Sequence, residues 1–339
     1  MKYTLQDIAR MANVSEAAVS MALNNKKGVS EETRLKIKEV ANQLHYKPNA
    51  IARSLVKQKS RTIGLVVSDT ENPYYGKIVK CVDSYIREFG YQLIIAISNE
   101  DPSTEVEIIE EFMSKQVEGI IVVPTNRPHN NSAYYNTLSK QHLPCIFLSA
   151  FYKGLDLPYV MVDLKEGMYN LVKYLLNIGH RDIYFICGNY QTIATDFRIE
   201  GYKAAYSELN VEINDNFFIE CPKVTFEQAY QSTIKLIKNA GNIDAIVTAN
   251  DYMALGVLKA LHDSKIKVPE DISVAGFDNV VFSSIATTPI TTVTQDIPEM
   301  VNICVDILLD IIKKNEFISM DPVFVKPELI IRESTSQKR

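Results

Sequence analysis

Hydrophobic residues in the first 46 positions recur with the period of amphipathic helices, in three short runs that each follow a capping residue. Thr4 is followed three residues later by Asp7, which is typical of an N-cap with an acidic partner in the first helical turn. The predicted helices span 5–11 after Thr4, 16–23 after Ser15 and 31–45 after Ser30. In the third, we expect buried Leu35, Ile37, Val40, Ala41 and Leu44. A helix, a tight turn, a second helix and a longer supporting helix form the helix-turn-helix arrangement, whose second helix enters the major groove of DNA.

The beginning of the second helix would then face the edges of the bases. Glu16 can accept a hydrogen bond from the N4 amine of cytosine, whereas Ala17 and Met21 can make only apolar contacts, for instance with a thymine methyl. Ser20 lies one turn further along the same face. A small three-helix interaction domain that binds no DNA has the same pattern, so the helices alone leave both interpretations open.

The segment after these helices is too short to form a stable fourth helix unless another molecule packs against it. Pro48 suits the first position of a helix and 49–56 can be helical, but a helix shorter than about 12 residues is marginal in water. Two copies side by side in a DNA minor groove would bury Ala52 and Leu55, and Leu55 could act as an apolar wedge at the central base step. We therefore interpret 48–61 as a hinge helix and linker that folds when DNA is bound.

From Thr62 the pattern changes to short apolar runs, each followed by an amphipathic helix. Uniformly apolar runs are typical of strands buried on both faces, and the intervening helices make right-handed crossovers between parallel strands. The predicted strands are 62–67, 91–97, 119–123, 145–148, 159–163, 182–187, 217–221, 244–249 and 272–277. We therefore predict a doubly wound α/β body, and this many strands suggests two sheets in two lobes.

Charge is divided unevenly along the chain. The 339 residues carry a formal net charge of −5, but residues 1–60 carry +6 and the remainder carries −11. A basic head on an acidic body suits a polyanionic partner that contacts only the head. The five cysteines show no metal-ligand or redox spacing, which is typical of buried thiols in a reducing cytoplasm.

Several classes of protein are disfavoured by what the sequence lacks. The N-terminus has no apolar secretory signal, and no segment approaches the ~20 apolar residues that span a bilayer, so we expect a cytoplasmic protein with no membrane partner. There is no G-x-G-x-x-G after the first strand, no glycine-rich phosphate loop with lysine and no G-x-S-x-G. We expect no enzyme, no cofactor and no metal site, although a carboxylate pair among 41 acidic residues would leave no motif.

The motifs of the head and the body occur together in one known family. LQDIARMANVS, VSEETR, HYKPNAIARSL and TIGLVV, followed by GHRDI, GYKAAY, TANDYMALG and ISVAGFDN, resemble the lactose/galactose-repressor (LacI/GalR) family of bacterial transcription regulators over essentially the whole chain. The resemblance implies an all-α helix-turn-helix head and a type I periplasmic-binding-protein body of two parallel-sheet lobes. It also implies that the positions of Glu16, Ala17 and Met21 read the operator, that Asn24 and Asn49 lie near the DNA backbone, and that Leu55 is the minor-groove wedge.

The predicted DNA-binding residues are therefore Thr4, Ser15, Glu16, Ala17, Ser20, Met21, Asn24, Asn49, Ala52 and Leu55. One departure from the family matters. Many members carry arginine or histidine where this chain has Met21, and polar residues where it has Ala17 and Ala18. The operator sequence of a relative therefore does not transfer to this chain.

The resemblance also divides the chain into domains. It implies a DNA-binding domain at 1–47, the hinge and linker at 48–61, and an effector-binding and dimerisation domain at 62–339, whose chain crosses between the lobes three times. We place the crossings near Met161, Thr291 and Pro322, so that one lobe comprises 62–160 with 292–321 and the other 162–290 with 323–335. Some members form tetramers through a C-terminal heptad segment. Because only RESTSQKR follows the end of the body that the resemblance implies, we expect a homodimer on a pseudo-palindromic operator.

Ligands of open α/β sheets bind at the carboxyl ends of the strands, so polar and aromatic residues just after strands are the candidates for an effector site. They lie at 69–75, 149–153, 192–198, 250–251 and 278–279. Arg198 and Asp278 can each bond two adjacent hydroxyls of a polyol, and Asn250 offers both a donor and an acceptor. The predicted effector site consists of Tyr74, Tyr75, Arg198, Phe226, Asn250, Asp278 and Gln295. As plainer roles, we expect Asp251 to be a helix cap and one of the two tyrosines to be core.

In sugar-responsive members of the family, the positions that match Tyr75, Arg198, Asn250, Asp278 and Gln295 bind the effector. The expected function is a sequence-specific DNA-binding regulator, most simply a repressor, controlled by a sugar or sugar derivative bound between the lobes. A nucleobase, another metabolite or a protein corepressor stays open as the effector. A cytoplasmic ligand-binding module whose head binds protein instead of DNA is the alternative from another class.

Overall fold

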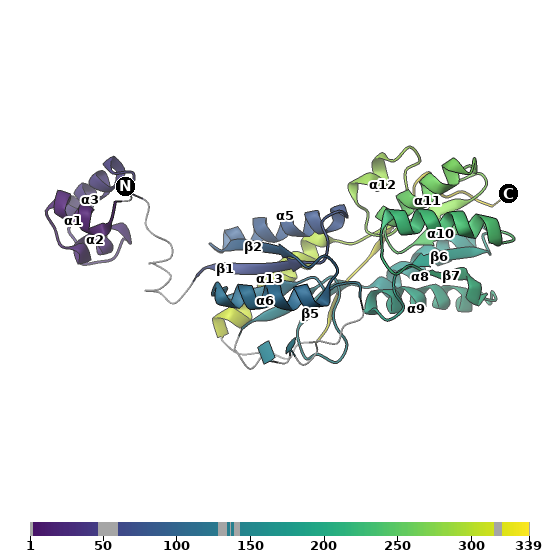
Figure 1. The fold of residues 1–339 in the computed structure, drawn as a ribbon, viewed down its shortest axis with the longest axis horizontal. Helices are drawn as coiled ribbons and strands as arrows, with labels where there is room; N and C mark the ends of the chain where they lie inside the picture. Colours follow the sequence, from purple (N-terminus) through teal and green to yellow (C-terminus); the bar gives the residue numbers. More distant parts are fainter. Residues whose placement is uncertain are drawn as a thin grey trace. The chain divides into compact units, whose positions relative to one another are not determined.

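The computed structural model describes residues 3–46, 60–127, 134–135, 137–138, 143–314 and 321–338. The chain forms two compact units, 1–60 and 61–339, which we call the head and the body. Figure 1 shows the helical head and the α/β body along the chain. Each unit is described by itself.

The head consists of three helices around a small apolar core: α1 (Leu5–Ala12), α2 (Glu16–Leu23) and α3 (Glu31–Gln43). Each begins at its predicted cap, because the side-chain oxygens of Thr4, Ser15 and Ser30 accept hydrogen bonds from amides three residues on. The prediction that Leu35 is buried is wrong, since its side chain is 63% exposed. It lies two residues, or about 200° around the helix, from the buried Ile37.

The first lobe of the body contains a parallel six-stranded sheet in the order β11-β5-β4-β3-β1-β2. Its strands are β1 (Thr62–Val67), β2 (Gln92–Ile97), β3 (Gly119–Val122), β4 (Cys145–Leu148), β5 (Tyr159–Val162) and β11 (Val323–Val325). Its helices are α5 (Pro73–Glu88), α6 (Pro102–Ser114) and α13 (Ile297–Lys314). Side chains of β1 alternate between the two faces, so that Leu65 joins the core under α5 and α13 while Val66 joins the core under α6.

The second lobe contains a parallel four-stranded sheet in the order β7-β6-β8-β9. Its strands are β6 (Ile183–Cys187), β7 (Phe218–Glu220), β8 (Ala245–Thr248) and β9 (Ser273–Ala275). Its helices are α8 (Leu164–Asn177), α9 (Ile193–Glu208), α10 (Phe226–Asn239), α11 (Asp251–Asp263), the short α12 (Val281–Ile285) and the 3-10 helix η1 (Asp215–Phe217). Helices α8 and α9 pack as one pair and α10 and α11 as another, and the sheet lies between the pairs (Figure 1).

Two of the three predicted crossings between the lobes are misplaced. β11 pairs with β5, with Val323 opposite Val160, so 323–325 belongs to the first lobe and not to the second. The strand β10 (Thr292–Thr294) was assigned to the first lobe, but Val293 accepts a hydrogen bond from the amide of Asp278 in the second. β10 also pairs antiparallel with β12 (Glu328–Ile330). Strands of three residues carry too little periodicity to reveal which sheet they join.

All nine predicted strands occur, seven of them with slightly different ends, and the doubly wound α/β prediction is confirmed. The three short strands β10, β11 and β12 were not predicted. Across the described ranges, no helix has the length and apolar character needed to cross a membrane.

Candidate DNA-binding face and effector cleft

The start of α2 presents its side chains to solvent. Glu16 and Ala17 are exposed, and Ser20 and Met21 are half-buried on the same helix. The Met21 sulfur packs against the turn that follows α2, so closely that a Cβ added to Gly28 would lie 3.2 Å from it. Asn24 ends the helix, and its side-chain amide donates to the carbonyl of Ser20 at 2.8 Å.

Thr4 and Ser15 are exposed, but their oxygens already cap α1 and α2, so these residues fix the helices before they can touch a partner. The sequence reasoning missed Arg34, whose guanidinium donates to the carbonyls of Ala22 at 3.2 Å and Lys26 at 2.8 Å. These two bonds hold the turn after α2. The predicted contacts Asn49, Ala52 and Leu55 lie outside the described residues.

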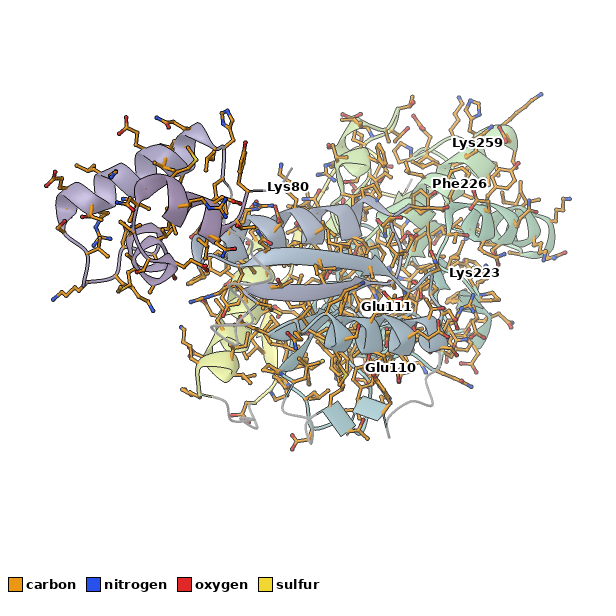
Figure 2. All side chains as sticks on the ribbon, turned by 60° about the vertical axis from the view of Figure 1, so that its left-hand side comes forward. Lys80, Glu110, Glu111, Lys223, Phe226 and Lys259 are labelled. Atoms are coloured by element: carbon orange, nitrogen blue, oxygen red, sulfur yellow. The ribbon has the colours of Figure 1, made fainter. Side chains whose placement is uncertain are left out.

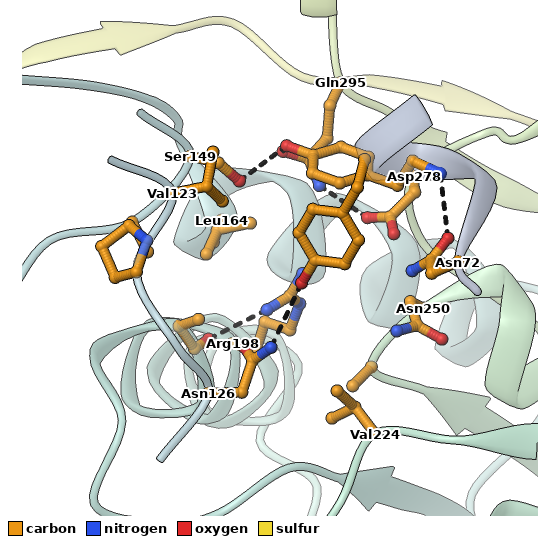
Figure 3. A pocket seen from close by; sticks show the side chains of 16 residues that line it. Asn72, Val123, Asn126, Ser149, Leu164, Arg198, Val224, Asn250, Asp278 and Gln295 are labelled. Carbon is orange, nitrogen blue, oxygen red and sulfur yellow. Dashed lines mark hydrogen bonds between the residues drawn. The ribbon is translucent and has the colours of Figure 1, made fainter. Parts of the chain in front are cut away.

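The body has a pocket between its lobes that gathers six of the seven predicted effector residues (Figure 3). It is lined by the predicted Tyr74, Tyr75, Arg198, Asn250, Asp278 and Gln295, together with Asn72, Asn126, Ser149 and several apolar residues. Phe226 does not line it. This residue opens α10 (Figure 2), and its ring lies 6.3 Å from that of Tyr252 on α11, so the prediction that placed it in the site is wrong.

Arg198 enters this pocket as a buried cation with unused donors. Its side chain is on α9, it is 8% exposed, and its guanidinium lies 4.6 Å over the ring of Phe277. One nitrogen, Nη1, donates to the carbonyl of Ala194 at 3.2 Å, while Nε is buried with no partner. Burial lowers the pKa of Arg198, and the nearby Asp278 opposes that shift. An unsatisfied buried donor costs free energy, so this nitrogen favours a ligand that accepts a hydrogen bond.

Asp278 enters the same pocket from the loop after β9 and is 5% exposed. Burial raises the pKa of its carboxyl to about 7, while Arg198 and hydrogen bonds from Gln295 and Asn72 act in the opposite direction. Its backbone has φ of +107°, a conformation that residues with a Cβ rarely adopt. Because such strain persists only where the surroundings impose it, the loop is held in a defined position.

A chain of hydrogen bonds links the two lobes through the pocket. The Gln295 amide donates to Asp278 at 2.6 Å, its oxygen accepts from the Tyr74 hydroxyl at 3.0 Å, and that hydroxyl lies 2.6 Å from Ser149 Oγ. Ser149 also has positive φ, at +73°. Since Tyr74 and Ser149 belong to the first lobe and Asp278 to the second, this chain of hydrogen bonds connects the two lobes.

Tyr74 and Tyr75 both belong to the buried core, where at least one was expected, and both also line the pocket. The Tyr75 hydroxyl accepts from the Asn126 amide at 3.3 Å, and the same amide donates to Glu100 at 2.7 Å. Asn126 was missed by the sequence reasoning, although it follows the third predicted strand by three residues. Applying the strand-end rule to that strand would have found it.

The cap of α11 is Asn250 and not Asp251 as expected, since the Asn250 side chain accepts from the amide of Met253 at 2.8 Å. Asp251 is fully buried and accepts from the amide of Val280 at 2.9 Å and the hydroxyl of Thr292 at 2.6 Å. Burial raises the pKa of the Asp251 carboxyl well above its usual value. Asp251 therefore ties α11 to the loop that carries Asp278.

No cluster of three or more histidine, cysteine, aspartate or glutamate side chains that could hold a metal ion occurs among the described residues. The pocket instead offers amides, hydroxyls, a buried cation and a buried acid around apolar walls. Such a set can bind a small polar molecule in a defined orientation. Nothing in it forms a nucleophile and base pair for covalent catalysis.

Comparisons with known proteins agree with this division of the chain. A family model described as "Bacterial regulatory proteins, lacI family" matches residues 4–49, and one described as "Periplasmic binding protein-like domain" matches 172–335. The chain is 33% identical to the HTH-type transcriptional regulator DegA of Bacillus subtilis (strain 168), over 88% of each chain.

Two solved structures share the fold over nearly the whole chain. One is the lac repressor dimer bound to operator and the anti-inducer ONPF, with a TM-score of 0.88 and 23% identity over 99% of this chain and 100% of that one. The other is the complex of the transcriptional regulator CelR with cellobiose, with a TM-score of 0.72 and 26% identity over 98% and 100%.

These matches define a helix-turn-helix transcription regulator with a periplasmic-binding-protein body. The chain belongs to the lacI family of bacterial regulatory proteins. It is accordingly a DNA-binding transcriptional regulator and not an enzyme.

Proposed function

We propose that this regulator represses transcription from a pseudo-palindromic operator as a cytoplasmic homodimer, and that a polyol, most simply a sugar, controls it from the pocket between the lobes. The observation that carries the proposal is the pair Arg198 and Asp278. Both are more than nine-tenths buried in one pocket, and Arg198 keeps an unpartnered Nε there.

A sugar supplies what these two residues lack. Adjacent hydroxyls can accept from the Arg198 guanidinium and donate to the Asp278 carboxylate, and such charge-assisted bonds are the stronger ones in proteins. Asn250 and Gln295 can complete the contacts, with Tyr74 and Tyr75 as aromatic walls. The similarity to a regulator that binds cellobiose supports this class of effector.

The effector must bind two arrangements of the lobes with different affinity, since a ligand that binds both equally shifts nothing. The bonds from Asp278 through Gln295 and Tyr74 to Ser149 join the two lobes in the structure. A ligand that bonds to the Asp278 oxygen held by Gln295 would compete with the Gln295 amide. We infer that this exchange couples occupancy of the pocket to lobe closure.

On the DNA side, we infer that 1–47 is the DNA-binding domain and 48–61 the hinge that folds on the operator. Glu16, Ala17, Ser20 and Met21 would read bases from α2, and Asn24 and Asn49 would lie near phosphates. Thr4 and Ser15 would contact DNA through the helix ends that they cap. Ala52 and Leu55 would enter the minor groove.

Exposed apolar side chains of the body support a dimer. Ile95 and Ile97 are exposed on β2, which is the edge strand of the first sheet. On the second lobe, α12 exposes Val281, Phe282 and Ile285, the last at 68%. Apolar edge strands and patches of this kind are normally covered in a native assembly. A second copy that covers both surfaces would place two heads for two half-sites.

The proposal is tested by measuring how small molecules change the affinity of the protein for operator DNA. Operator DNA is first selected from random sequences with the full-length protein, and its binding is followed by fluorescence anisotropy while neutral sugars and nucleobases are added. We expect at least one sugar to change operator affinity and to raise the melting temperature of the body. A response to nucleobases only, or to no small molecule, would overturn the sugar proposal while leaving the DNA-binding function intact.

A further inference from the structure

The effector pocket continues into a second hollow that the sugar contacts do not use. The two share Pro124, Asn126, Ala150 and Ala194 in their walls. The inner pocket has a cavity volume of about 60 Å³ and the second hollow one of about 180 Å³. A ligand held between Arg198 and Asp278 therefore has additional room on this side.

Arg127 lines the second hollow and is half-buried there. Its charge adds to the hydrogen bonds from Thr104 that lower the pKa of the nearby Asp101 carboxyl. Lys153 lines the same hollow from the first lobe, but it already pairs with Asp196 of the second lobe at 2.6 Å. Arg127 is thus a cation in the wall of this hollow, and Lys153 is one that can exchange its partner.

The opposite wall of the hollow is the N-terminus of α9, formed by Thr192, Ile193 and Ala194. The Thr192 side chain does not cap this helix, because its hydroxyl donates to the carbonyl of Asn189 at 2.9 Å instead. The first amides of a helix have no partner within the helix, and they carry the positive end of its dipole. Asp196 offsets part of this charge, but it is engaged by Lys153.

Arg198 adds a buried positive charge in the adjoining inner pocket. It stands on the same helix, one turn beyond Ala194, and it is more than nine-tenths buried with Nε unpartnered in the inner pocket that shares Ala194 with the hollow. Arg127 and the first amides of α9 therefore line the second hollow with hydrogen-bond donors, while Arg198 and Asp278 line the adjoining inner pocket. Neutral sugars need acceptors as well as donors, whereas an oxyanion needs donors only.

We propose that the second hollow binds an acidic substituent, a phosphate or a carboxylate, of the sugar whose ring occupies the inner pocket. The proposal rests on the sugar-binding function proposed above and adds the charge of the effector to it. The substituent accepts hydrogen bonds from Arg127 and from the first amides of α9, and it draws Lys153 away from Asp196. The effector class is then a sugar phosphate or a sugar acid rather than a neutral sugar.

The experiment measures binding to the full-length protein by isothermal titration calorimetry, with matched sets of ligands. Each set contains a neutral aldose, its terminal phosphate and its uronic acid, for several hexoses and pentoses. In the responsive set, we expect an acidic form to bind roughly 10- to 100-fold more tightly than the neutral parent, as one or two charge-assisted bonds allow. Comparing the affinities of the terminal phosphate and the uronic acid shows which acidic group the hollow binds better.

Variants of Arg127 test whether this residue causes the tighter binding of the acidic form. Arg127→Gln should abolish the preference for the acidic form and leave the affinity for the neutral parent unchanged, and Arg127→Lys should keep most of it. The matched control is Lys80→Gln, which removes an exposed positive charge of α5 that lines neither the inner pocket nor the second hollow (Figure 2). Equal binding of neutral and acidic forms, or equal loss in both arginine variants and the control, overturns this inference alone. If no sugar of any charge binds, the proposed function itself fails.

Discussion

The head and the body each contain a carboxylate that we propose to contact a ligand, and the two lie in opposite surroundings. Glu16 stands exposed in the first turn of α2, whereas Asp278 is buried at the bottom of a pocket with its pKa raised to about 7. An exposed group keeps its water until the partner arrives, so it contributes selectivity to an interface that phosphate contacts hold together. A buried group has already lost its water, so each hydrogen bond that a small ligand adds is strong.

The two sites also differ in how far apart in sequence their parts lie. The head places Glu16 through bonds that span three or four residues, such as the cap from Ser15 to the amide of Ala18. The pocket joins Tyr74 to Gln295 across 221 positions. Substitutions in the head should therefore have local effects, whereas substitutions that disturb the packing of the body should also weaken binding in the pocket.

The largest effect is expected for Arg198→Ala. Losing two charge-assisted hydrogen bonds should weaken effector binding by roughly 100-fold or more, while operator affinity without effector stays the same. The matched control is Lys203→Ala, an exposed lysine on the same helix. Calorimetry with the effector and anisotropy with the operator separate the two affinities. An equal loss of DNA binding would contradict the division between the two sites.

Gly201→Ala tests whether packing away from the pocket controls it. A Cβ at this position of α9 would collide with the backbone oxygen of Lys165 on α8, so the helices must separate. We expect about 1–3 kcal/mol of destabilisation and a weaker effector affinity, because α9 carries Arg198. Gly76→Ala, with nothing within 4 Å of its Cβ, should be neutral or slightly stabilising. Thermal melting checks both, and loss of operator binding at temperatures below the melting transition would argue against a local origin.

The difference in sequence separation between the two sites also explains which residues could be predicted from the sequence. The caps Ser15 and Ser30 were found because a cap and its helix adjoin each other in the chain. Asp278 was found because strand ends meet at one edge of a sheet. Phe226 was placed wrongly, since its position at a helix start does not say that its ring turns toward Tyr252. The lobe of β11 was missed because the pairing of three residues with β5 depends on the whole sheet.

The pH dependence should belong to the pocket. Because the pKa of Asp278 is raised to about 7, the carboxyl is mostly protonated below that pH and cannot accept two hydroxyl hydrogen bonds. We expect effector affinity to rise as pH increases through about 7, by up to about tenfold per pH unit below it. For the fold the sign is the reverse. The folded state holds this proton more tightly than the unfolded chain, so its contribution to stability is lost as pH rises from about 4 to about 7.

Asp278→Asn is the matched variant for this pH dependence, since it keeps the shape and removes the titration. Its effector affinity, measured by calorimetry from pH 5.5 to 8.5, should be low and nearly independent of pH. A slope that persists in the variant would assign the titration to another buried acid. Glu100 is one such group, since burial also raises its pKa and it accepts a hydrogen bond from Asn126 in the pocket wall.

The smallest effect is expected in the head, for Ser15→Ala. The Ser15 oxygen caps α2 through the amide of Ala18 at 3.2 Å, and losing such a cap costs about 1 kcal/mol. Because the cap acts only on the helix that follows it, amide exchange should quicken in α2 and operator affinity should fall by roughly fivefold, while effector affinity stays unchanged. Ser15→Thr, which retains a capping oxygen, should restore the slower exchange. If exchange instead quickened in the body as well, the head and the body would be coupled in stability, and the local character of the head would be refuted.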